Sequence, residues 1–188
     1  MAPTQSASTG APQSREGGSA VSAERHEAPP PHPAVASLAF LLGTWVGEGE
    51  GEYPTIAPFA YTEQITISHV GKPFLAYAQR TWSIDDGRPL HAETGYWRCG
   101  PDGRVELVVA HPTGHVELGE GTVAGTTVTL ASTSVTGTPS AKDVRSVTRH
   151  LEVDGEHLRS RLDMAAVGQP LVPHLRATLL RASSDRRS

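Results

Sequence analysis

The chain has 188 residues, of which 37% are hydrophobic and 19% charged, a composition that excludes a wholly disordered chain and a membrane protein. Its formal net charge of -4 argues against nucleic acid as a partner, because phosphates require a basic surface. No run approaches the roughly 18 apolar residues that cross a bilayer, and no apolar secretory segment opens the chain. The single cysteine, Cys99, excludes an intrachain disulfide and thiolate-held zinc or iron–sulfur sites, so we expect a cytoplasmic protein.

Residues 1–33 consist mainly of Ala, Pro, Ser, Gly and scattered charges, and they predict a disordered tail because they cannot bury enough apolar area to offset chain entropy. We expect the folded domain to cover residues 34–182, with a short tail at 183–188. The apolar segment that starts at Ala34 predicts one short helix ended by Gly43.

Beyond this helix, apolar and polar side chains alternate with a period of two, which is typical of strands with one buried face. The clearest apolar sets are Tyr61, Ile65 and Ile67; Val105, Leu107 and Val109; and Leu158, Leu162 and Met164.

Turn signals separate these runs at short intervals: 70–73, 85–87, 101–103, 113–114, 124–125 and 154–155. They predict about ten strands over residues 44–182, joined as an antiparallel up-and-down meander. Closure into a barrel would remove the exposed edge strands, and a barrel of this size can hold a ligand.

Four alternate glycines, Gly43, Gly47, Gly49 and Gly51, share one face of the first predicted strand. Glycine in a strand marks a sharp bend or a close approach of another group, so we interpret them as sites of barrel closure around a structural Trp45. Phosphate binding is disfavoured because no helix follows to direct its amides at an anion.

Nine histidines invite a search for metal ligands, but there is no H-E-x-x-H or paired Cys/His spacing. Sequence motifs of hydrolases, P-loop proteins and dinucleotide-binding proteins are also absent. On the residues alone, His91, His111 and His174 are each more often packed or rim residues than ligands.

Several motifs in order resemble the nitrobindin family of haem proteins, and together they span about residues 38–181. They are Gly43-x-Trp45-x-Gly47-x-Gly49, then 52–56, 69–73, 90–96 and 110–114, and finally Met164 with Pro173-His174-Leu175. The resemblance implies a ten-stranded barrel of the fatty-acid-binding-protein and lipocalin type.

The resemblance also implies a haem b with Fe(III), for which His174 is the proximal metal ligand. His91 is implied as a second catalytic residue, which would orient or protonate a bound anion. The remaining positions implied to contact the haem or line its pocket are Thr55, Leu90, His111, Lys142 and Met164. Nitrobindins often carry Gln where this chain has His111. An apolar barrel interior is expected to supply most of the haem affinity.

The activity implied is isomerisation of peroxynitrite to nitrate, with reversible binding of nitric oxide, so the expected partners are small molecules. Two alternatives stay open: a non-catalytic nitric oxide sensor or haem carrier, and an iron-free carrier of hydrophobic ligands. The sequence also leaves open whether the chain is a monomer or a homodimer.

Overall fold

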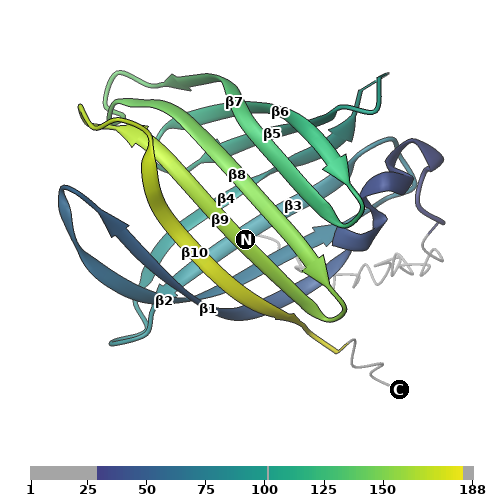
Figure 1. The fold of residues 1–188 in the computed structure, drawn as a ribbon, viewed down its shortest axis with the longest axis horizontal. Helices are drawn as coiled ribbons and strands as arrows, with labels where there is room; N and C mark the ends of the chain where they lie inside the picture. The colour runs from purple at the N-terminus through teal and green to yellow at the C-terminus, as the bar shows by residue number, and fades with distance from the viewer. Residues whose placement is uncertain (1–28, 101, 184–188) are drawn as a thin grey trace, which may run out of the picture.

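The computed structural model describes residues 29–100 and 102–183, which form a closed antiparallel β-barrel (Figure 1). Each strand pairs with its neighbours in sequence, and β1 closes the barrel against β10. The prediction of a ten-stranded up-and-down barrel is confirmed. Within the same residues, no helix is long and apolar enough to cross a membrane.

The described chain starts with a short helix and continues through strands only. The elements are η1 (Pro33–Leu41), β1 (Gly43–Tyr53), β2 (Ile56–Ser68), β3 (Leu75–Ser83), β4 (Pro89–Cys99), β5 (Val105–His111), β6 (His115–Ala124), β7 (Thr127–Gly137), β8 (Val144–Asp154), β9 (His157–Ala166) and β10 (Val172–Arg181). The predicted short helix is a 3-10 helix, and it ends before Gly43, whose positive φ of 127° begins β1. Residues 1–28 and 184–188 lie outside the described residues, so the two predicted tails stay predictions.

The meander gives the barrel two different ends. Every turn that follows an odd-numbered strand lies at one end, which we call the mouth; η1 packs at the other end, which we call the helix end (Figure 1). The sequence signals located the turns at 85–87 and 113–114 of the mouth, but they missed those that join β1 to β2, β7 to β8 and β9 to β10.

Trp45 lies at the helix end and is fully buried, as the sequence predicted. Its indole Nε1 donates to the carbonyl of Leu41 over 2.9 Å, and the Arg181 guanidinium lies 3.9 Å from the ring centre. Val35 and Leu38 of η1 are also fully buried in this core. The helix therefore caps an apolar core that closes this end of the barrel.

The glycines of β1 allow close approach of neighbouring groups, as their spacing predicted. A Cβ at Gly47 would lie 2.3 Å from the carbonyl oxygen of Thr178 on β10, inside van der Waals contact. A Cβ at Gly51 would lie 2.2 Å from the ring of Phe59 on β2. Because the neighbour of Gly47 is backbone of β10, that position requires glycine for β1 to close the barrel, whereas Gly51 leaves room for the Phe59 ring.

The expectation of an apolar interior is wrong in the middle of the barrel. A layer of polar side chains lies there on inward positions of five strands, and we call it the polar layer: Glu63, Tyr77, Gln79, Glu93, Glu117 and Arg149. All six are buried, and they bond to one another, which offsets the cost of removing them from water.

Candidate functional site

His174 lies at the mouth, at an irregularity in β10. The register between β10 and β9 shifts between Pro173 and Leu175, so that His174 is the extra residue of a β-bulge. A bulge redirects the side chain it carries, which explains why simple alternation along β10 does not place this imidazole. His174 is half-buried.

The Nδ1 atom of His174 lies 3.0 Å from the carbonyl oxygen of Glu52 on β1. A carbonyl oxygen can only accept, so Nδ1 carries a proton, and in the neutral imidazole Nε2 then keeps its lone pair. The ring also packs edge-on against Tyr53, with 5.1 Å between ring centres and 68° between the planes. Tyr53 is itself fixed, because its hydroxyl accepts from the backbone amide of Ala166 over 2.8 Å. The tautomer and the orientation of His174 are therefore both set by β1.

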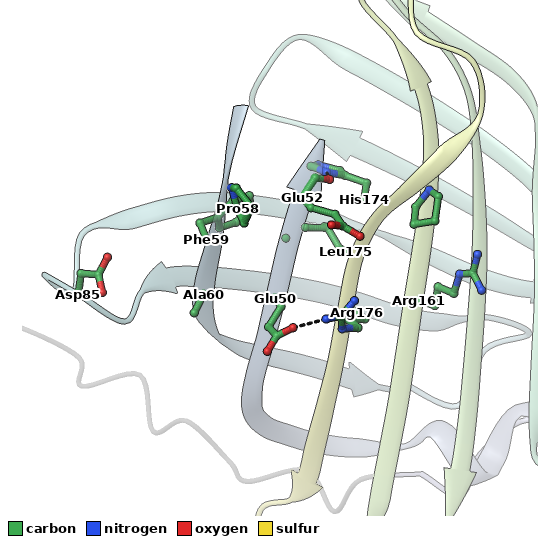
Figure 2. A pocket seen from close by; sticks show the side chains of 12 residues that line it. Glu50, Glu52, Pro58, Phe59, Ala60, Asp85, Arg161, His174, Leu175 and Arg176 are labelled. Atoms are coloured by element: carbon green, nitrogen blue, oxygen red, sulfur yellow. Dashed lines mark hydrogen bonds and ion pairs between the residues drawn. The ribbon is translucent and has the colours of Figure 1, made fainter. Parts of the chain in front are cut away.

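A cavity of about 620 Å³ lies beside this imidazole (Figure 2). Its volume is within the roughly 300–1,000 Å³ typical of small-molecule and cofactor sites. The lining residues come from β1, β2, β9, β10 and the turn after β3: Glu50, Gly51, Glu52, Pro58, Phe59, Ala60, Asp85, Arg161, Pro173, His174, Leu175 and Arg176. Apolar groups and guanidinium groups therefore border the same space.

These residues fit a haem. His174 offers an unprotonated Nε2, and its Nδ1–H bond to a carbonyl is the outer contact that ligating histidines normally make. Leu175 and Phe59 supply apolar surface, and Arg161 and Arg176 are cations that could meet propionates. Both guanidinium groups already have carboxylate partners, Asp163 and Glu50, which hold them at the rim.

The other positions implied by the family resemblance are spread around the mouth and do not line this cavity. Thr55 is exposed in the turn between β1 and β2. The Lys142 side chain is exposed, although its carbonyl oxygen lies 2.6 Å from Nε2 of His115. Met164 is half-buried on β9. Their contacts with a haem stay predictions.

Leu90, His91 and His111 come together on the opposite wall, because β4 and β5 are four and five strands away from β10 in the closed order. Leu90 packs against the core at a register shift between β3 and β4. His111 Nδ1 lies 3.3 Å from His91 Nε2, and the ring centres are 5.5 Å apart. Their role over an open iron face is likewise a prediction.

The charged part of the polar layer is built around Arg149. Its guanidinium donates to both carboxylate oxygens of Glu93, over 2.7 and 3.1 Å, and to both of Glu117, over 3.0 and 2.7 Å. Burial raises the pKa of both carboxyls, but the charge of Arg149 has the larger effect in the opposite direction. The pKa of Glu93 is therefore well below the usual range of a carboxyl, and the pKa of Glu117 is also below it.

Sequence reasoning missed this layer. A signal for it was available, since Glu93, Glu117 and Arg149 occupy inward positions of alternating strands next to buried apolar residues.

Glu63 lies in the same layer without a cation bonded to it. Burial raises the pKa of its carboxyl to about 7, although a hydrogen bond of 2.7 Å from Gln79 Nε2 opposes the shift. The second carboxylate oxygen of Glu63 and the amide oxygen of Gln79 are buried acceptors with no partner. A proton on Glu63 would supply the donor that this pair lacks.

Comparison with known proteins supports the resemblance. The model of the family described as "THAP4-like, heme-binding beta-barrel domain" matches residues 34–181. The chain is 54% identical over 154 residues to "Peroxynitrite isomerase 1" of Mycolicibacterium paratuberculosis, a match that covers 80% of this chain and 96% of that protein. It is 48% identical to "Peroxynitrite isomerase 1" of Mycobacterium tuberculosis, over 79% of this chain and 95% of that protein. The crystal structure of Rv2717c from M. tuberculosis superposes with a TM-score of 0.76 at 48% identity, covering 82% of this chain and all of that one. The chain therefore belongs to the family of THAP4-like, heme-binding beta-barrel domains.

Proposed function

We propose that this chain binds haem b as Fe(III), converts peroxynitrite to nitrate and binds nitric oxide reversibly. The observation that carries the proposal is the His174 imidazole beside a cavity of cofactor size, with its Nδ1 bonded to the Glu52 carbonyl so that Nε2 is left for a ligand. Relatives about half identical to the chain, and matched over most of their length, are named peroxynitrite isomerases. The single cysteine favours a reducing compartment, and we propose the cytoplasm.

Haem iron, when bound, supplies a Lewis-acidic centre for an anionic substrate. The contribution of the chain is to hold one imidazole in a fixed tautomer, through the Glu52 carbonyl and the Tyr53 ring. A fixed ligand costs less entropy to order when the cofactor arrives, because β1 and β10 already define its orientation. On the opposite wall, His91 offers a half-exposed imidazole that could donate a proton to an anion in the mouth.

The proposal is tested by mixing haem-loaded protein rapidly with peroxynitrite and following its decay together with the nitrate yield. We expect faster decay and more nitrate than in buffer, and a loss of both effects in His174→Ala. His157→Ala removes an exposed histidine at the helix end and should behave like the parent. The proposal would be contradicted if His174→Ala catalysed the decay as fast as the parent, or if the parent did not catalyse it. Nitric oxide binding is measured separately by flash photolysis.

A further inference from the structure

Three potential metal ligands meet on the wall of the mouth opposite His174. His91 and Glu93 lie two residues apart on β4, and His111 ends the neighbouring β5. His111 Nδ1 lies 3.3 Å from His91 Nε2 and 3.3 Å from Glu93 Oε2, and the last two atoms lie 3.7 Å apart. Each residue thus directs one nitrogen or oxygen at the same small space.

The size of this triangle decides what can lie inside it. The centre of a triangle with these sides is about 2.0 Å from each corner, which is the length of a zinc–nitrogen or zinc–oxygen bond. Two ligand atoms of a tetrahedral ion lie roughly 3.3–3.4 Å apart, as bonds of about 2.0–2.1 Å require. The donor atoms are therefore spaced for a metal ion with little rearrangement.

The contacts behind the triangle hold two of its members in place. Glu93 accepts from the Tyr77 hydroxyl over 2.5 Å and from Arg149 at both oxygens, so its carboxylate has one orientation. The other ring nitrogen of His111, Nε2, lies 3.5 Å from a carboxylate oxygen of Glu117. A carboxylate behind a ligating histidine is the usual outer contact at zinc sites.

The local charge also favours a cation. Two buried carboxylates, Glu93 and Glu117, surround the single guanidinium of Arg149, which leaves one negative charge in a region of low dielectric constant. The competing arrangement is a proton shared among His91, His111 and Glu93, which would use the same atoms.

We propose that His91, Glu93 and His111 bind one divalent transition metal ion of the zinc type. Two imidazoles and a carboxylate are the ligand set of sites that keep a fourth position for water, and the 33% exposed His91 side chain gives solvent access. None of the three residues lines the cavity at His174, so metal binding does not depend on haem, although an ion on His91 would occupy the imidazole that the proposed function assigns as a proton donor.

The test is a titration of the full chain, freed of metal by chelation, with Zn²⁺ in a calorimeter and with Co²⁺ in a spectrophotometer. We expect one equivalent to bind and an intense tetrahedral Co²⁺ spectrum. His111→Gln, which keeps a polar side chain of similar size, should weaken binding by more than the roughly 10–100-fold that the loss of an outer contact costs. His150→Gln, which alters an exposed histidine on the outside of β8, should bind like the parent.

Far-UV circular dichroism first establishes that His111→Gln is folded; if it is not, His91→Gln takes its place with the same expectation. Absence of binding, several weak equivalents, or equal affinity in parent and variant would each overturn the proposal and leave the shared proton as the occupant. Repeating the titration in His174→Ala without haem separates this result from the fate of the haem proposal, because the metal site should be intact there.

Discussion

Glu63→Gln should make the barrel more stable at alkaline pH, although it removes a charge-bearing side chain from the interior. Glutamine copies the neutral form of Glu63 and can still accept from Gln79 Nε2. The ionised form is the costly one, because Glu63 is buried and has no bonded cation to compensate it.

The size of the effect follows from the pKa of Glu63, which burial raises from 4.5 to about 7. One pKa unit corresponds to about 1.4 kcal/mol, so this shift corresponds to about 3 kcal/mol. Because the folded-state pKa is raised, the contribution of Glu63 to stability is fully present below pH 4.5 and is lost as the pH rises to about 7. Between pH 5 and pH 8 the free energy of unfolding of the parent should therefore fall by about 2–3 kcal/mol, and that of Glu63→Gln should not show this fall.

Urea unfolding at both pH values measures this difference, and the comparison with the variant cancels the titration of other groups. Glu48→Gln serves as the matched control, because Glu48 is exposed on β1 and the change in charge is the same. Parallel pH profiles for the parent and Glu63→Gln would refute the reasoning, since they would mean that the Glu63 carboxyl ionises without cost in the folded state.

Three further variants test the packing of the barrel, each by urea unfolding. Trp45→Ala should lower the free energy of unfolding by about 3–5 kcal/mol, the usual range for a fully buried aromatic side chain. A change within error would contradict the burial of Trp45 at the helix end. Arg149→Met should lower the free energy of unfolding by about 3–5 kcal/mol, because it leaves Glu93 and Glu117 charged and uncompensated. Adding Glu93→Gln and Glu117→Gln should recover much of this loss, and no recovery would refute the charge argument. Val167→Asn should raise the free energy of unfolding by about 1 kcal/mol, because Val167 lies in the turn before β10 with a positive φ of 47°, and asparagine tolerates a positive φ better than valine does. A loss of stability would contradict this.

Most of the fold could be predicted from the sequence because barrel strands carry a local signal. Residues such as Ile65 and Leu107 are buried where the period of two places them, and glycines such as Gly125 take the positive φ that tight turns require. The turn between β9 and β10 was missed because its first residue with a positive φ is Val167, where a typical turn sequence has Asn or Gly.

The site was predictable only in part. Alternation cannot place His174, because a β-bulge puts it out of register, and only the family motif singled it out. The metal-ligand triangle joins His91 and Glu93 of β4 with His111 of β5, and these lie in two motifs whose contact depends on the pairing of the strands. Arg149 is distant from both of its partners in the chain, so its pairing follows from barrel closure and not from any local pattern.

The central claim, that His174 is the axial ligand of a haem, is tested most directly by resonance Raman spectroscopy of the reduced, haem-loaded protein. We expect an iron–histidine stretching band in the parent, its loss in His174→Gly, and a shifted band when free imidazole is added to that variant, because the fold keeps the place of the missing ring. An unchanged band in His174→Gly would contradict the account, since another histidine would then hold the iron.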